Sequence, residues 1–211
     1  MSTKGKGGPG TKKQDDEQTR ERILKAALEL FCRSGFEGVT ISEIARQADA
    51  AQPIIYYYFK DKEALWKSAV APAFERAMLR AADVQDLVDL KPSDRLSVSL
   101  RRYIKASVEN LEVMKTMIHE SASPGPRLDW LIETYLKPAH MATEFQLREA
   151  APELDVPPVF VISLVVGWIH FFFGSRNLIK TIHDVDPHDP EVRNAFTDFC
   201  VSQVRHALKL D

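Results

Sequence analysis

Residues 40–65 of the chain read TISEIARQADAAQPIIYYYFKDKEAL, and this stretch decides the fold. Thr40 and Glu43 have the spacing of a capping box, in which the two side chains satisfy free backbone donors at the start of a helix. Apolar residues then recur at helical spacing over residues 41–48. The pattern predicts a short helix with one buried face.

A second short helix follows a brief interruption. Residues 49–51 break the apolar pattern, and Pro53 suits the first turn of a helix that runs to about Phe59. A longer helix with one apolar stripe precedes both short helices, from about Glu17 to a stop at Gly35. This arrangement predicts a helix-turn-helix, whose second helix enters the major groove of DNA.

The second short helix carries side chains that suit contacts with DNA. Gln52 can bond a base edge, Pro53 can touch a thymine methyl, and the tyrosines at 56–58 can reach methyls or phosphates. An aromatic cluster at helical spacing usually belongs to a core, which is the alternative interpretation. Adjacent helical residues point about 100° apart, so three tyrosines in a row cannot all be buried. Ile55 and Phe59, four residues apart, are expected to face inward.

The same stretch resembles the DNA-binding signature of the TetR/AcrR family. In that family a T-x-x-x-I-A-x-x-A-G-V-S helix leads into a recognition helix ending Y-x-Y-F-x-x-K-E-x-L. The resemblance implies base contacts from Gln52, Pro53 and Tyr56. It implies contacts with the DNA backbone and its phosphates from Thr40, Ser42, Tyr57, Tyr58 and Lys62.

The turn departs from the family pattern. Asp49, Ala50 and Ala51 stand where the family commonly has Gly, Val and Ser. The change removes a side-chain cap worth about 1 kcal/mol. It also places an Asp where a glycine often adopts a left-handed conformation, which Asp tolerates better than most residues.

Longer helices follow, separated by proline-containing breaks, and no segment alternates like a strand. They are expected at residues 63–82, 93–121, 127–150, 157–180 and 190–209. The predicted fold class is all-α, with an N-terminal three-helix helix-turn-helix domain followed by a helical-bundle ligand-binding and dimerisation domain. The expected divisions are a flexible basic arm (1–16), the DNA-binding domain (17–62) and the effector-binding and dimerisation domain (63–211).

Charge and cysteine content agree with an intracellular DNA-binding protein. The first 67 residues carry 12 basic and 10 acidic side chains, and the rest carry 16 and 20, so the N-terminal part is better suited to meet a polyanion. Cys32 and Cys200 are too few for a disulfide framework, which fits a reducing cytoplasm, and both are expected to be buried. The apolar run at 159–173 is too short for a bilayer span, so no membrane contact is expected.

The resemblance implies a homodimer that pairs through the last two helices, about 157–180 and 190–209. The first of these is nearly apolar all round, which favours a partner surface over the alternative of a helix buried in one monomer. A small, largely apolar effector of unknown identity is expected to release the dimer from palindromic operator DNA. Its candidate pocket residues, each of which also suits a core, are Met114, Met117, Ile118, Trp130, Tyr135, Met141, Phe145, Trp168 and Phe172.

Other functions fit parts of the sequence less well. The cluster of His183, Asp184, Asp186, His188, Asp189 and Glu191 suggests a metal site, but its better interpretation is a loop in which Asp189 caps the last helix. We therefore expect no metal and no cofactor. A small helical enzyme could use His119, Glu120 or His170, yet no catalytic motif accompanies them. An architectural DNA-binding dimer without an effector would not need so large a C-terminal body.

Overall fold

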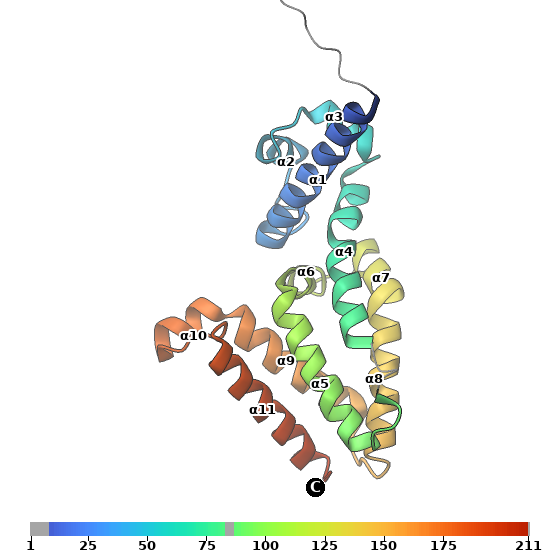
Figure 1. Cartoon of the computed structure of the whole chain (residues 1–211), viewed down its shortest axis with the longest axis vertical. Helices are drawn as coiled ribbons and strands as arrows, with labels where there is room; N and C mark the ends of the chain where they lie inside the picture. The colour runs from blue at the N-terminus through green and yellow to red at the C-terminus, as the bar shows by residue number, and fades with distance from the viewer. Residues whose placement is uncertain (1–8, 83–86, 211) are drawn as a thin grey trace, which may run out of the picture. The chain divides into compact units, whose positions relative to one another are not determined.

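The computed structural model describes residues 9–82 and 87–210, and within these ranges it contains helices and no strand (Figure 1). The predicted all-α class is confirmed. The helices are α1 (Pro9–Ser34), α2 (Ile41–Gln47), α3 (Gln52–Tyr58), α4 (Lys62–Ala82), α5 (Pro92–Glu109), α6 (Leu111–Glu120), α7 (Pro126–Leu131), the π-helical turn η2 (Ile132–Leu136), α8 (Lys137–Ala150), α9 (Pro158–Gly174), α10 (Arg176–His183) and α11 (Pro190–Ala207).

The chain divides into two compact units, Met1–Pro72 and Ala73–Asp211. Helix α4 crosses the division, and Pro72 lies inside it. A proline in a helix interior has no N–H for the carbonyl four residues earlier, which locally weakens the helix. Pro72 thus removes one backbone hydrogen bond from α4 at the last residue of the first unit.

The first unit is built around the apolar stripe of α1. The side chains of that stripe, Ile23, Ala26, Ala27, Leu30 and Phe31, are all buried. Gly35 has φ 70° and donates its N–H to the carbonyl of Phe31 at 2.9 Å, so it ends α1 as predicted. The helix begins at Pro9 rather than near Glu17, because residues 11–22 include many good helix formers and no glycine or proline.

In the described part of the second unit, helices α5, α6, α8, α9 and α11 contribute to a hydrophobic core. Leu100 and Ile104 of α5 lie in it, together with Ile169 and Phe173 of α9. The other buried members are Leu96, Met114, Leu147, Ala151, Val165, Cys200, Val201, Val204 and Leu208. Both cysteines of the chain are buried, as predicted.

Three helices predicted as continuous are interrupted. At Asn110 the backbone leaves the helical region, with φ −131° and ψ 59°, and the side-chain amide donates to the carbonyl of Ala106 at 2.9 Å. Such local bonds let asparagine compete with the helical backbone. The segment 127–150 contains the π-turn η2 just before Pro138, which lacks the N–H that Thr134 would need for a regular helix.

The third break separates α9 from α10. Ser175 has φ −95° and ψ 29°, and the two helices meet at 71°. Among the described residues, no single helix is long and apolar enough to span a membrane. Within residues 9–82 and 87–210, the pair α9 and α10 reaches that length and hydropathy when taken together, and it is bent.

Candidate nucleic-acid interface

Helix α2 begins with the predicted capping box. The Thr40 amide donates to the Glu43 carboxylate at 2.8 Å, and the Glu43 amide donates to the Thr40 hydroxyl at 3.2 Å. The bond from the Thr40 backbone is the main reason that the pKa of Glu43 is lowered. Thr40 and Ser42 are both exposed at this end of α2, where contact with a DNA backbone was predicted.

The turn between α2 and α3 forms without glycine. Asp49 adopts the left-handed conformation, with φ 49°, and the Ala50 amide donates to the carbonyl of Ala45 at 3.0 Å. Ala51 is the N-cap of α3 and gives it no side-chain hydrogen bond. The departure from the family pattern therefore leaves α3 uncapped at its start, while Asp49 replaces the usual glycine.

Helix α3 separates buried from exposed side chains as predicted. Ile55 and Phe59 are 1% and 4% exposed and anchor α3 in the core of the first unit. Tyr56 and Tyr57 are 54% and 78% exposed, and Gln52 and Pro53 lie in the exposed first turn. Large exposed aromatic side chains beside an amide form a surface that can contact base edges and phosphates.

Two residues predicted to contact phosphates, Tyr58 and Lys62, already interact with other residues of the first unit. The Tyr58 hydroxyl donates to the carbonyl and the carboxylate of Asp16, at 3.0 and 3.2 Å. Burial and then this bond raise the pKa of Tyr58. The ammonium of Lys62 lies 4.2 Å from the centre of the Phe36 ring.

Helix α1 contributes two residues to the surroundings of α3 that sequence reasoning missed. Besides Asp16, the guanidinium of Arg20 lies 5.5 Å from the centre of the Phe59 ring. Asp16 and Arg20 are one helical turn apart, so both reach the C-terminal end of α3. Their sequence separation from α3 is large and no local pattern links them, so the sequence carries no signal for this contact.

Three of the candidate effector-pocket residues lie together and the rest lie elsewhere: Met114 belongs to the core of the second unit, and Trp168 and Phe172 pack against it. Met114 is buried in the core, whereas Ile118, Met141 and Phe145 are 57%, 64% and 62% exposed. The others lie in aromatic groups: Trp130 and Tyr135 with Phe74, Trp168 with Phe199, and Phe172 with Phe196, while Met117 is half-buried.

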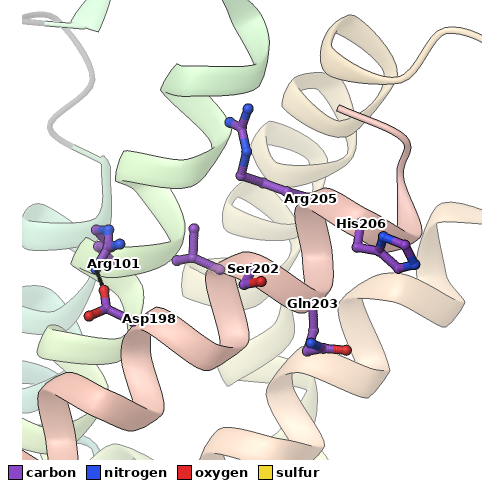
Figure 2. A pocket seen from close by; sticks show the side chains of 7 residues that line it. Arg101, Asp198, Ser202, Gln203, Arg205 and His206 are labelled. Atoms are coloured by element: carbon purple, nitrogen blue, oxygen red, sulfur yellow. Dashed lines mark hydrogen bonds and ion pairs between the residues drawn. The ribbon is translucent and has the colours of Figure 1, made fainter. Parts of the chain in front are cut away.

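An open hollow of about 640 Å³ lies between α5 and α11, and none of the predicted pocket residues lines it (Figure 2). Its lining is mostly polar and consists of Arg101, Asp198, Val201, Ser202, Gln203, Arg205 and His206. Both of its arginines already have acidic partners, since Arg101 pairs with Asp198 and Arg205 with Asp94.

The acidic loop before α11 is organised by hydrogen bonds between its own side chains and backbone. Asp186 accepts two bonds from Arg176, at 2.8 and 2.7 Å, and this pairing is the main reason that its pKa lies far below the ordinary value. Asp189 accepts from the Glu191 amide at 2.8 Å and caps α11, as predicted. Among the residues that the structure describes, no group of three metal-ligating side chains is assembled.

The residues considered for catalysis are also dispersed. Glu120 is buried and forms an ion pair with Arg127 at 3.0 Å, while His119 beside it in sequence is exposed. His170 is half-buried in α9, where burial lowers its pKa. These side chains form no common site.

Comparison with known proteins places the similarity mainly in the first unit. A family model described as "Bacterial regulatory proteins, tetR family" matches residues 23–69. The HTH-type transcriptional repressor NicS of Pseudomonas putida is 33% identical over 95 residues, which are 45% of this chain and 44% of NicS. The chain thus spans less than half of that relative.

Two further proteins are similar over most of the chain. The tetracycline repressor protein class D of Escherichia coli is 22% identical over 193 residues, covering 76% of this chain and 87% of the repressor. The crystal structure of HlyIIR, a hemolysin II transcriptional regulator, matches with a TM-score of 0.66 at 22% identity and covers 89% of this chain and 97% of that one. All three proteins are named as repressors or regulators of transcription and none as an enzyme.

Proposed function

We propose that the chain is a TetR-family repressor that binds palindromic operator DNA as a homodimer, on the basis of the match of residues 23–69 to the tetR family model and of the similarity to NicS. A small, largely apolar effector releases it. The observation that carries the proposal is the division of α3 into a buried side, with Ile55 and Phe59, and an exposed side, with Tyr56 and Tyr57. A regulator of this kind acts on the chromosome, in the bacterial cytoplasm.

In the proposed complex, α3 lies in the major groove and contacts both base edges and phosphates. Gln52 offers an amide donor and acceptor to a base edge, while Pro53 and Tyr56 contact thymine methyls. Tyr57, the most exposed of the three tyrosines, donates its hydroxyl to a phosphate. Thr40 and Ser42 at the start of α2 and Lys62 at the start of α4 meet the DNA backbone.

The proposed dimer forms through α9 and α11, with α10 extending the first of them. Phe160, Leu164 and Phe171 are 63%, 52% and 60% exposed, and their spacing of four and seven residues aligns them along one side of α9. Gly167 lies on the same stripe, and a Cβ atom there would meet nothing within 4 Å. Phe199 of α11 is 54% exposed. Such an apolar stripe is suited to a second copy of the chain.

The proposed domains are the arm at 1–16, the DNA-binding domain at 17–62 and the effector-binding and dimerisation domain at 63–211. Effector release would act through α4, because this helix continues from one unit into the other. In the second unit Phe74 of α4 lies 5.2 Å, ring centre to ring centre, from Tyr135, which also hydrogen-bonds Glu75. An apolar molecule that displaced Tyr135 would remove both contacts from α4.

Selection from a random library of double-stranded DNA tests the proposal. The full-length chain should enrich a palindrome whose two half-sites lie about one helical turn, or 10 base pairs, apart. Enrichment of a single unpaired half-site would contradict the dimer, and no enrichment at all would contradict sequence-specific binding. An architectural protein without an effector would enrich only weakly preferred, deformable sequences, because such proteins read the shape of DNA more than its bases.

A further inference from the structure

The Tyr58 hydroxyl at the end of α3 is held by an acidic residue of α1. It donates to the backbone carbonyl of Asp16 at 3.0 Å and to a carboxylate oxygen of Asp16 at 3.2 Å. Asp16 is exposed, and Tyr58 is half-buried between it and the rest of the first unit. The hydroxyl therefore already has an anionic acceptor in the protein itself.

A carboxylate and a DNA phosphate are chemically similar partners for a phenol. Both offer anionic oxygens, and either can accept a charge-assisted hydrogen bond from the phenol. The hydroxyl has one proton, so its bond to Asp16 is weakened or lost when it donates to a phosphate. A phosphate at that position would also lie within a few ångströms of the Asp16 charge and be repelled by it.

A cationic side chain, Arg20, also lies near Tyr58. The Arg20 guanidinium lies 5.5 Å from the centre of the Phe59 ring, next to Tyr58, and its charge opposes the rise in the Tyr58 pKa. Arg20 on its own would attract a DNA phosphate to this end of α3. Asp16, one turn earlier on the same helix, offsets that attraction.

We propose that Asp16 competes with a DNA phosphate for the Tyr58 hydroxyl and thereby limits the affinity of the chain for its operator. This inference rests on the proposed function, because it needs α3 to lie against DNA. Asp16 would then lower DNA affinity. Without this acidic side chain, the Tyr58 hydroxyl could donate to a DNA phosphate without competition.

Asp16→Asn separates competition from a purely structural role. Asparagine has nearly the same shape and can still accept a bond from Tyr58, and the bond to the backbone carbonyl is unaffected. Only the negative charge is removed. Asp15→Asn is the matched control, because Asp15 is adjacent and exposed, and removing its charge has the same long-range effect on a polyanion.

The experiment measures binding of the full-length chain to a duplex that the wild-type chain enriches from a random library. Asp16→Asn should bind about fivefold more tightly than wild type, a difference typical of one hydrogen bond. Asp15→Asn should gain clearly less. In a Tyr58→Phe background, which has no hydroxyl to compete for, the advantage of Asp16→Asn over Asp15→Asn should shrink to the part that comes from repulsion between the Asp16 charge and the phosphate.

Three results would overturn the inference. If Asp16→Asn and Asp15→Asn increased DNA affinity equally in the wild-type background, Asp16 would act only through its general negative charge. A gain from Asp16→Asn that persisted in full with Tyr58→Phe would show that the hydroxyl is not involved. Weaker binding by Asp16→Asn would show that Asp16 supports the interface. If no duplex is enriched, the proposed function itself fails, and this inference fails with it.

Discussion

The amide of Thr40 donates to the Glu43 carboxylate while the Glu43 amide donates to the Thr40 hydroxyl, so the two residues close the first turn of α2 from both sides. Free N–H groups at a helix start otherwise depend on water. For a helix of seven residues, this cap is a large part of what fixes the starting point. The direction of α2, and through the turn that of α3, depends on it.

Replacement of Thr40 should therefore destabilise the first unit. Thr40→Ala removes the hydroxyl that accepts from Glu43 and should lower the free energy of unfolding by about 1 kcal/mol. Thr40→Ser keeps the hydroxyl and should remain close to wild type. Urea denaturation of the three proteins followed by circular dichroism measures the difference. Equal stability of the alanine and serine variants would show that the cap contributes nothing.

The strained turn gives a prediction of the opposite sign. Asp49 has φ 49°, a region that disfavours residues with a Cβ atom by about 1 kcal/mol and that glycine adopts freely. Asp49→Gly should thus raise the free energy of unfolding by up to about 1 kcal/mol, and Asp49→Ala should lower it. If the glycine variant melts at a lower temperature than wild type, the turn is held by the Asp49 side chain instead.

The pH dependence of stability should reveal the pairing of Asp186 with Arg176. Because its pKa is lowered in the folded chain, the Asp186 carboxylate stabilises the fold above its ordinary pKa, near 4, and this contribution is lost as pH falls toward the folded pKa. Asp186→Asn should be less stable than wild type at pH 6, and the difference should shrink below pH 4. Thermal melts over this range measure it. A difference that does not change with pH would contradict the assignment.

The proposed dimer interface can be tested with two phenylalanines of similar exposure. Phe171 on α9 is 60% exposed and Phe145 on α8 is 62% exposed. Phe171→Glu places a charge in the proposed interface and should give a monomer at micromolar concentration in sedimentation, while Phe145→Glu should sediment like the wild-type dimer. A wild-type chain that sediments as a monomer would contradict the proposed dimer. Dissociation by Phe145→Glu but not by Phe171→Glu would place the interface elsewhere.

Local signals in the sequence predicted the first unit well. The capping box, the stop at Gly35 and the buried positions of Ile55 and Phe59 each follow from residues a few positions apart, and all are confirmed. The hydrogen bond from Tyr58 to Asp16 and the contact of Lys62 with the Phe36 ring join residues far apart in the sequence. Short-range sequence patterns could not predict them.

The second unit was predicted less completely. Its proline-containing boundaries were correct, because proline acts locally on the backbone. The break at Asn110 carries neither proline nor glycine, and there the interruption is reinforced by Arg76 of α4, whose Nε lies 3.3 Å from the side-chain oxygen. The break at Ser175 follows Gly174, the last residue of α9, but glycine alone does not predict where a helix ends. The expected pocket residues remain a prediction, since apolar side chains in a bundle suit a core and a ligand site equally.

The central claim is that α3 reads bases, and a comparison of Gln52→Ala with Tyr57→Phe tests it most directly. Both variants and the wild-type chain would be titrated against the selected duplex and all of its single-base substitutions. Gln52→Ala should bind more weakly and lose about 1–3 kcal/mol of discrimination at one position of each half-site. Tyr57→Phe should weaken binding to every duplex by the same factor. An unchanged base preference in Gln52→Ala would contradict the account.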